Sequence, residues 1–373
     1  MRILYVSTIS ATINAFLIPH IHLLLDLGHT VDMACNVKDP IDPSLLERGC
    51  RVFPMSFQRS PLKKSNYAAY QSLKQLISEG KYDCVHTHTP VASTVTRLAC
   101  RNMPDVKVIY TAHGFHFFEG APRKNWLIYY PVEKWLSGYT DLLITMNSED
   151  YGQAKKRFHA KAGRFVKGVG VNLDKYVVPS ENEKQKLRQE YGFASEAFIL
   201  VYPAELSYRK HQDLLIEAMV GVAKNIPNSK LLLVGDGPSE EDYRQLISER
   251  QLENHIVLMG YRKDVAKLLM LSDVAVSSSR QEGLPVNVME AMATGLPLVV
   301  SNCRGNRDLV KDGRNGYVIT GDSPETYAEK IGQLYKDANV REMMKHANLT
   351  DIQHYSTESV LKEMEIIYKE LLV

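Results

Sequence analysis

Short apolar runs alternate with amphipathic helical patterns along the whole chain, which predicts an α/β fold. In the first half, the apolar runs cover residues 3–6, 30–34, 52–55, 84–88, 106–112 and 141–146. Helical patterns lie between them, at residues 13–27, 67–78 and 91–101. Strands that alternate with helices indicate a parallel sheet with helices on both faces.

The same alternation begins again after a glycine-rich segment near residues 168–175. The second set of apolar runs covers residues 198–203, 230–234, 257–259, 274–278 and 298–301. We therefore expect two doubly wound, Rossmann-like domains that face each other across a cleft, at residues 1–168 and 169–356. Ligands of such sheets bind at the carboxyl ends of the strands, so the cleft is where we expect the site.

Composition excludes several classes of protein. Hydrophobic residues make up 45% and charged residues 24%, which is typical of a globular chain, and the net charge of +2 argues against a nucleic-acid partner. The five cysteines form no C-x-x-C pair, and Cys84 and Cys100 lie in apolar runs. Reduced core thiols, as in a cytoplasmic protein, are therefore expected rather than disulfides or zinc. No apolar run of about 18 residues predicts a membrane-spanning helix.

Several ligand-binding motifs are absent from the sequence. It contains no G-x-G-x-x-G, no P-loop, no H-E-x-x-H and no D-x-D, so we expect neither a dinucleotide nor a metal cofactor. His86 and His88 lie two apart in an apolar run and point the same way from a strand. A metal site needs a third ligand that is not evident, which favours polar residues that line the mouth of the cleft.

The segment from Ser277 to Gly295 carries the strongest chemical signal. A strand ends in small polar residues, a loop carries Glu282 and Gly283, and a helix with Pro285 in its first turn is predicted to run to Thr294. The start of such a helix suits a phosphate, and a carboxylate one turn inside it, Glu290, suits ribose hydroxyls. Glu282 could accept from sugar hydroxyls. Two alternatives to donor binding stay open for this segment. It could be a capped helix whose two acids face solvent, or the two acids could catalyse the hydrolysis of a glycoside.

Two further groups of residues are candidates. Arg209 and Lys210 are expected to open a helix, where cations are unfavourable unless an anion binds. His113 is followed by Gly114 at the end of a strand, which suits a hydrogen bond to a sugar hydroxyl. The alternative for Arg209 and Lys210 is a solvated basic pair, and the alternative for His113 is a histidine packed in the core.

Taken together, these segments resemble glycosyltransferase family 4, whose members have the GT-B fold, and the resemblance covers nearly the whole chain. Glu282 and Glu290 match the two acids of the family's E-x7-E motif. Lys210 matches the lysine that binds the donor diphosphate, and His113 matches the histidine near the transferred sugar. The glycine-containing loops at residues 235–237 and 260–262 match loops that line the nucleotide base.

The resemblance implies a retaining hexosyltransferase that uses a UDP-sugar and no metal or other cofactor. It implies an acceptor-binding first domain, onto which a helix at residues 357–373 crosses back, and a nucleotide-sugar-binding second domain. The implied catalytic residues are His113, Lys210, Arg209 and Glu282. The implied donor-binding residues are Gly235, Asp236, Gly237, Tyr261, Arg262, Glu282, Gly283, Leu284, Pro285, Val286 and Glu290.

Two positions depart from the family pattern. Family members often have an arginine five residues before the lysine, whereas this chain has Glu205, and Arg209 is the candidate to replace that charge. Many members also have a Gly-Gly loop after the first strand. Here the corresponding loop is predicted at residues 10–14, without glycine, so diphosphate contacts from it are in doubt.

The segment at residues 113–136 has a narrower resemblance, to bacterial transferases that build exopolysaccharide or capsule units on a polyprenyl-diphosphate carrier. This resemblance favours a UDP-N-acetylhexosamine donor, a lipid-linked or other glycan acceptor, and a cytoplasmic protein bound peripherally to the inner face of the cell membrane. Cations among aromatic residues suit an anionic membrane surface. The expected acceptor and membrane patch comprises Arg59, Lys63, Lys64, Arg123, Lys124 and Trp126. The alternative is a helix packed on its own domain.

Other functions remain open at this point. A UDP-sugar epimerase or a phosphorylase could use the same fold, because fold does not fix the reaction. A non-catalytic nucleotide-sugar-binding protein is a third hypothesis, and the presence of all the matched site residues disfavours it.

Overall fold

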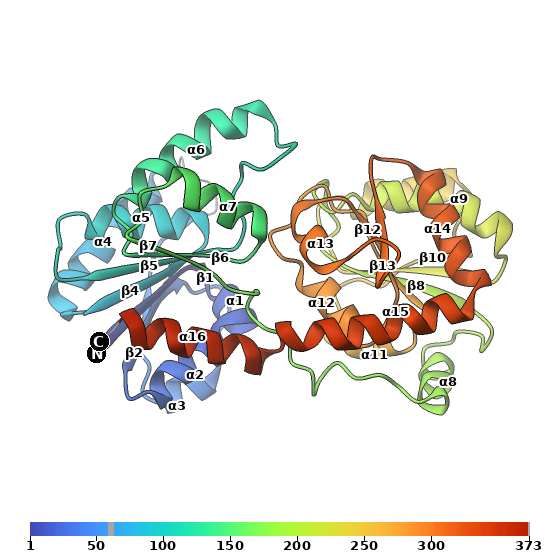
Figure 1. Ribbon diagram of the computed structural model, residues 1–373, viewed down its shortest axis with the longest axis horizontal. Coiled ribbons are helices and arrows are strands. Elements are labelled where there is room, and N and C mark those ends of the chain that lie inside the picture. Colours follow the sequence, from blue (N-terminus) through green and yellow to red (C-terminus); the bar gives the residue numbers. More distant parts are fainter. Residues whose placement is uncertain (59–62, 372–373) are drawn as a thin grey trace. The chain divides into compact units, whose positions relative to one another are not determined.

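The computed structural model describes residues 1–58 and 63–371, and the chain divides into two compact units (Figure 1). The first unit comprises Met1–Gly170 together with the C-terminal segment that begins at Thr357. The second unit is Val171–Ser356, which is inserted between these two parts. Each unit is described by itself.

The first unit contains a fully parallel sheet of seven strands in the order β3-β2-β1-β4-β5-β6-β7. Sequence order reverses between β1 and β4, so the sheet has its topological switch point there. The strands are β1 (Arg2–Ile9), β2 (Thr30–Asn36), β3 (Val52–Pro54), β4 (Cys84–His88), β5 (Lys107–Ala112), β6 (Leu142–Thr145) and β7 (Ala162–Phe165).

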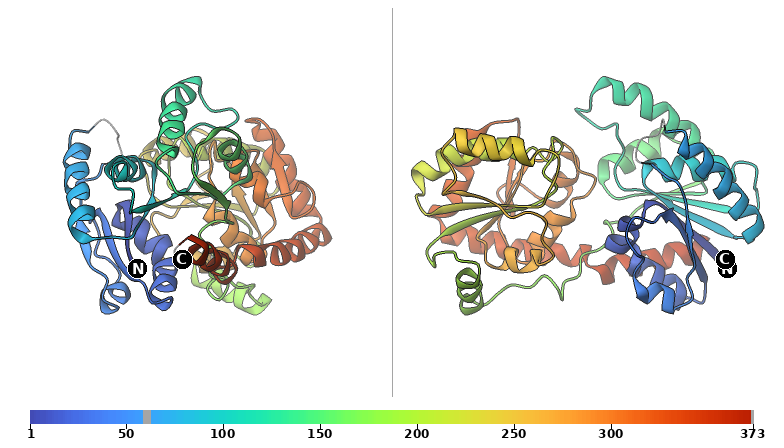
Figure 2. Two further views of the ribbon diagram at one scale, coloured as in Figure 1. Left: turned by 60° about the vertical axis from the view of Figure 1, so that its left-hand side comes forward. Right: turned by 180° about the vertical axis from the view of Figure 1, so that it is seen from behind.

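Helices cover both faces of this sheet (Figures 1 and 2). Ile3 and Tyr5 of β1 pack with helices α2 and α16, whereas Leu4 and Val6 pack on the opposite face with α4 and α5. This alternation follows from the two-residue period of a strand. The helices are α1 (Ser10–Thr12), a π-helical turn (Ile13–Leu17), α2 (Ile18–Asp26), α3 (Pro43–Glu47), α4 (Ser65–Gly80), α5 (Pro90–Cys100), α6 (Arg123–Ser137), α7 (Ser148–Arg157) and α16 (Thr357–Leu371).

The second unit contains a parallel sheet of six strands in the order β10-β9-β8-β11-β12-β13, with its switch point between β8 and β11. The strands are β8 (Phe198–Pro203), β9 (Ser229–Val234), β10 (Ile256–Leu258), β11 (Val274–Ser277), β12 (Leu298–Ser301) and β13 (Gly316–Ile319).

The second sheet is also buried on both faces. Leu200 and Tyr202 of β8 pack with α9 and α14, and Ile199 and Val201 pack with α11 and α12. The helices are α8 (Glu181–Glu190), α9 (Gln212–Asn225), α10 (Glu240–Glu249), α11 (Val265–Met270), α12 (Val286–Ala293), α13 (Arg304–Leu309), α14 (Pro324–Lys336), α15 (Ala338–Asp351) and a 3₁₀ turn (Ile352–Tyr355).

The predicted α/β fold with two Rossmann-like sheets is confirmed, and Cys84 and Cys100 are buried as expected. The loop predicted at residues 10–14 is wrong, because helical structure begins at Ser10, directly after β1. Ser10 Oγ accepts hydrogen bonds from the backbone N–H groups of Lys38 and Asp39, at 3.1 and 3.0 Å. These contacts with a distant segment fix the start of the helix.

Candidate functional site

A buried ion pair lies at the switch point of the second sheet. Lys210 follows β8 and Glu282 follows β11, and these two strands are hydrogen-bonded neighbours. Lys210 Nζ donates to Glu282 Oε1 at 2.5 Å, and both side chains are buried. Strand pairing thus joins two predicted site residues that are 72 positions apart.

Glu282 is held in its charged form. Burial alone would raise the pKa of its carboxyl, but the charges of Lys210 and Arg209, with hydrogen bonds from Lys210 and Ser279, lower the pKa below its usual value. Ser279 Oγ donates to the same oxygen as Lys210, at 2.6 Å. Oε1 of Glu282 therefore holds Lys210 in place. The predicted contact between Glu282 and a sugar hydroxyl stays a prediction.

Two hydroxyl groups fix the backbone at Lys210, and a third contacts one of them. Tyr202 Oη and Ser278 Oγ donate to the Lys210 carbonyl at 3.1 and 3.0 Å, and Ser279 Oγ lies 2.7 Å from Tyr202 Oη. The small polar residues at the end of β11 were visible in the sequence, but their bonds to Lys210 were not predicted.

The prediction that Arg209 and Lys210 open a helix is wrong. They lie in a turn, and α9 begins at Gln212 with His211 as its N-cap in a left-handed conformation, at φ 56°. The turn frees the Lys210 side chain from the helix and directs it toward Glu282.

Arg209 lies between two carboxylates. Its guanidinium is 3.5 Å from Glu282 and 4.0 Å from Glu205, and 47% of its side chain is exposed. Glu205, which occupies the position where family members often have an arginine, thus contacts Arg209. Replacement of that arginine by Arg209 stays a prediction.

The helix α12 begins one residue later than predicted. Pro285 is its N-cap rather than a first-turn residue, and the first helical residue is Val286. The helix ends as predicted, with Thr294 as the C-cap and Gly295 at φ 75°, a conformation that glycine adopts readily. Gly283 and Leu284, in the loop before the helix, are partly buried.

Glu290 lies in the second turn of α12 and is partly buried. Tyr176 Oη donates to its carboxylate at 2.5 Å, and burial raises the pKa of the Glu290 carboxyl. The sequence did not identify Tyr176 as a site residue, because it lies in the irregular segment before α8 and its partner Glu290 is 114 residues away.

The segment 235–237 makes close contact with the backbone that follows β8. Gly235 and Gly237 have φ values of 147° and 155°, and the Asp236 carbonyl accepts from the Leu206 N–H at 2.8 Å. A Cβ at either glycine would overlap the backbone of Ala204 or Leu206. Glycine is therefore required at both predicted donor positions to shape this loop.

The second predicted base-lining loop is paired with the first. Gly235 N–H donates to the Gly260 carbonyl at 2.9 Å. Tyr261 is 70% exposed, and Arg262 forms an ion pair with Asp264 at 2.5 Å. The two loops thus lie together at the carboxyl ends of β9 and β10.

Two residues at the start of α13 support the loop before α12, and the sequence reasoning missed both. The buried Arg304 donates from Nε to the Glu282 carbonyl at 2.9 Å. Gly305 packs so closely that an added Cβ would lie 2.5 Å from the Gly283 carbonyl oxygen. The glycine four residues after the buried strand β12 was the available signal for this close approach.

In the first unit, His113 is the predicted catalytic residue. It lies directly after β5, and Gly114 at φ 137° forms the expected turn. His113 Nε2 lies 3.1 Å from His88 Nδ1, so each ring fixes the orientation of the other.

The expectation that His86 and His88 line the mouth of a cleft is wrong. Both are buried inside the first unit, with ring centroids 4.3 Å apart. His86 hydrogen-bonds to Thr111 at 2.8 Å and to Tyr368 of α16 at 3.0 Å.

The buried histidines are neutral near pH 7. Burial, followed by charge repulsion among the histidines, lowers the pKa of His86 and His88 well below the usual value and that of His113 to about 4. A neutral His113 suits a hydrogen bond to a sugar hydroxyl.

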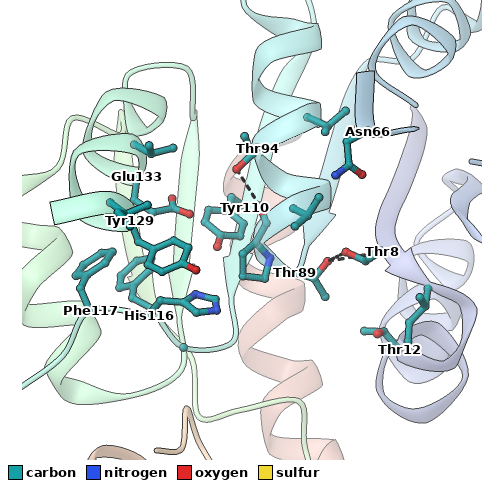
Figure 3. Close-up of a pocket in the computed structure, with 18 residues that line it drawn as sticks. Thr8, Thr12, Asn66, Thr89, Thr94, Tyr110, His116, Phe117, Tyr129 and Glu133 are labelled. Carbon is teal, nitrogen blue, oxygen red and sulfur yellow. Dashed lines mark hydrogen bonds between the residues drawn. The ribbon is translucent and has the colours of Figure 1, made fainter. Parts of the chain in front are cut away.

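A pocket of about 590 Å³ opens at the switch point of the first sheet (Figure 3). It lies beside the ends of β1, β4 and β5, where Thr8, Thr89 and Phe115 line it, and it extends between α5 and α6. In Figure 3, Thr8, Thr12 and Asn66 are on the opposite side from His116, Phe117, Tyr129 and Glu133. This pocket was not predicted from the sequence.

Helix α6 exposes an apolar face. Leu127, Ile128, Val132 and Trp135 are 77%, 59%, 41% and 52% exposed, and their spacing places them on one side of the helix. Arg123 and Lys124, at the start of the helix, are exposed, as are Lys63 and Lys64 before α4. Arg59, the remaining cation of the predicted patch, lies outside the described residues.

Trp126, the aromatic residue of the predicted patch, packs on its own unit. Its ring lies 5.5 Å from that of Phe117 and 5.8 Å from that of Tyr130, and its Nε1 donates to the Phe118 carbonyl at 3.2 Å. One side of α6 therefore packs on its own domain, as in the alternative to a membrane-surface helix. The exposed apolar face described above is the other side of α6.

Comparison with known proteins identifies the family. The glycosyl transferases group 1 family matches residues 183–350, and the glycosyl transferase 4-like family matches residues 2–147. The chain is 39% identical over 371 residues to the Bacillus subtilis (strain 168) protein "Putative glycosyltransferase EpsD", covering 98% of this chain and 96% of that one. This chain belongs to the group 1 glycosyltransferases. The resemblance inferred from Lys210, Glu282 and Glu290 is thereby confirmed.

This glycosyltransferase is also similar to a further relative and to a solved structure. The UDP-Gal:alpha-D-GlcNAc-diphosphoundecaprenol alpha-1,3-galactosyltransferase of Escherichia coli is 27% identical, covering 92% of this chain and 89% of that one. The crystal structure of Anabaena Alr3699/HepE in complex with UDP and glucose is similar in fold, with a TM-score of 0.82 and 20% identity over 99% of this chain and all of that one. The fold is GT-B.

Two other features are absent from the part of the glycosyltransferase that the structure describes. No helix there is both long and apolar enough to cross a lipid bilayer. No group of three or more His, Cys, Asp or Glu side chains there is placed to hold a metal ion.

Proposed function

We propose that this glycosyltransferase transfers an N-acetylhexosamine, with retention of configuration and without a metal, from a UDP-sugar to a polyprenyl-diphosphate-linked or other glycan acceptor. The transfer would serve polysaccharide biosynthesis. The observation that carries the proposal is the buried Lys210–Glu282 pair beside the start of α12 at the switch point of the second sheet.

The charges at this point suit a diphosphate leaving group. An ammonium group has three donors, so Lys210 can hold Glu282 and still donate to a phosphate oxygen. Arg209, which is half-exposed, and the backbone N–H groups at the start of α12 add positive potential. Donors that are already fixed stabilise charge that develops on the leaving group without a cost of reorganisation.

The other contacts with the UDP-sugar are proposed from the chemical character of the side chains and loops. Glu290, oriented by Tyr176, is proposed to accept from the ribose hydroxyls. The loops at residues 235–237 and 260–262 are proposed to line the base. Neutral His113, oriented by His88, is proposed to bind a hydroxyl of the transferred sugar.

The acceptor proposal rests on the relatives and on the first unit. The name of the Escherichia coli relative specifies a diphosphoundecaprenol-linked acceptor. The exposed apolar face of α6, with Arg123 and Lys124 at its start, suits an anionic lipid surface. We accordingly propose that the protein works in the cytoplasm, bound peripherally to the inner face of the cell membrane.

A thermal-shift series of nucleotide sugars tests the donor. A UDP-N-acetylhexosamine at about 100 times its Kd should stabilise the fold by about 2.7 kcal/mol, and raise Tm on the order of 5–10 °C. EDTA should leave the shift unchanged. Stabilisation by GDP- or ADP-sugars instead of UDP-sugars would contradict the proposal, as would a shift that requires a metal. Radiolabelled sugar transferred to a lipid-linked acceptor then identifies the product.

We expect Gly305→Ala to weaken UDP-sugar binding roughly tenfold or more, because small displacements of binding groups have large effects. The new Cβ would lie 2.5 Å from the Gly283 carbonyl oxygen and 2.8 Å from Pro285 Cδ, so the loop before α12 must move. Calorimetric titration measures the affinity. Gly332→Ala in α14 is the control, since nothing lies within 4 Å of its added Cβ. Equal affinities for the two variants would show that this packing does not shape the site.

A further inference from the structure

The pocket of the first unit is continuous with the exposed side of α6. Ile128 and Val132 line the pocket and are also 59% and 41% exposed. An elongated ligand can therefore lie in the pocket and leave it along the apolar face of α6, toward Leu127 and Trp135.

The wall of this pocket is suited to an apolar ligand. One side includes the apolar residues Phe117, Ile128 and Val132, and the side formed by α5 contributes Val91 and Val95. At about 590 Å³, the volume is within the range of small-molecule sites.

Four polar side chains of the wall are already paired within the protein. Thr8 and Thr89 hydrogen-bond to each other at 2.7 Å, and Thr94 Oγ1 donates to the Pro90 carbonyl at 2.9 Å (Figure 3). Glu133 forms an ion pair at 2.8 Å with Arg97, which is buried. An apolar ligand can therefore displace water from these groups without leaving them unpaired, which is the usual cost of burying polar atoms.

Cations lie close in sequence to two lining residues. Arg123 and Lys124 precede Ile128 on α6, and Lys63 and Lys64 precede the lining residue Asn66. All four are exposed. An apolar pocket with exposed cations nearby fits a ligand that has an apolar chain and an anionic head.

We propose that this pocket binds the first isoprene units of an isoprenyl diphosphate, the part of a lipid-linked acceptor that adjoins its diphosphate. The assignment of this ligand to an acceptor rests on the proposed function. The chain continues from the pocket along the exposed face of α6, and the cations contact the diphosphate. The pocket thus recognises the lipid carrier, separately from the sugar.

Tryptophan fluorescence can report on this pocket directly. The chain has two tryptophans, Trp126 and Trp135, and both are in α6. Trp135→Phe leaves Trp126, which packs against the lining residue Phe117, as the single reporter. Titration of this variant with farnesyl diphosphate should give a saturable fluorescence change, and inorganic diphosphate should give none. Absence of a saturable change with farnesyl diphosphate would overturn the proposal.

Variants of α6 test the location. Ile128→Gln and Val132→Gln, made in the Trp135→Phe chain, should each raise the Kd for farnesyl diphosphate roughly tenfold, the scale for changing an apolar contact in a pocket. Leu46→Gln is the matched control, because Leu46 is an exposed leucine of α3 in the same unit and lies neither in the pocket nor on α6. The same loss in all three variants would place the ligand elsewhere.

The thermal shift with UDP-sugar, measured on the same variants, separates this proposal from the proposed function. A normal UDP-sugar response without farnesyl diphosphate binding would refute the pocket alone. Farnesyl diphosphate binding in a chain that no UDP-sugar stabilises would support the pocket and refute the donor.

Discussion

Replacement of Lys210 by methionine is expected to lower the turnover number about 10²–10³-fold, the usual scale for removing one group that stabilises transition-state charge. Methionine keeps most of the volume of the lysine chain but cannot donate to the diphosphate. Steady-state assays of sugar transfer give the turnover number, and the KM for the UDP-sugar should change less. Lys224→Met, on an exposed position of α9, is the control for a lost surface charge.

Loss of Lys210 also leaves Glu282 as a buried charge without its closest partner. Breaking such a pair costs about 3–5 kcal/mol of stability, so the single variant could lose activity by unfolding. The double variant Lys210→Met/Glu282→Gln removes both charges and should recover most of the Tm but not the activity. If the double variant regained normal turnover, Lys210 would have only a structural role.

Replacement of Glu290 by glutamine should weaken UDP binding roughly 10–100-fold. Hydrogen bonds to a charged group contribute about 1.5–3 kcal/mol, and each 1.4 kcal/mol is a factor of ten in affinity. Glutamine preserves the shape of the side chain, so the loss reports on the charge that faces the ribose hydroxyls. Calorimetric titration with UDP measures the change.

Tyr176→Phe separates the orientation of Glu290 from its direct contact with the nucleotide. The variant removes the 2.5 Å hydrogen bond to the carboxylate but leaves the charge in place. It should weaken UDP binding less than Glu290→Gln. Deoxygenated analogues of the ribose should bind equally to Glu290→Gln and to the parent chain, and a parent-like affinity of Glu290→Gln for UDP would disprove the ribose assignment.

Much of the fold could be predicted from the sequence because its strands are buried on both faces. Such strands appear as continuous apolar runs, as at residues 3–6 and 198–203, and every run named in the sequence analysis became a strand. The short helices α3 and α13 and the strands β7 and β13 were missed, since four to six residues carry too little periodicity. The helix that starts at Ser10 depends on hydrogen bonds from Lys38 and Asp39, which no local pattern records.

The site residues could be proposed individually, but their contacts could not. Lys210 and Glu282 were visible as charged residues after buried strands, yet their pairing depends on β8 and β11 being neighbours. The support from Arg304 and Gly305 depends on the close packing of α13. The pocket beside α6 is formed by side chains of several elements, so no single stretch of sequence encodes it.

The insertion of Val171–Ser356 within the first unit determines the order in which the chain can fold during synthesis. The second unit contains its whole core within one continuous stretch, and domains generally fold as units as they emerge from the ribosome. The core of the first unit includes Val360, Met364 and Tyr368 of α16, which are translated after the second unit. The first unit therefore completes its folding after the second unit, and until then one face of its sheet lacks the cover that α16 provides.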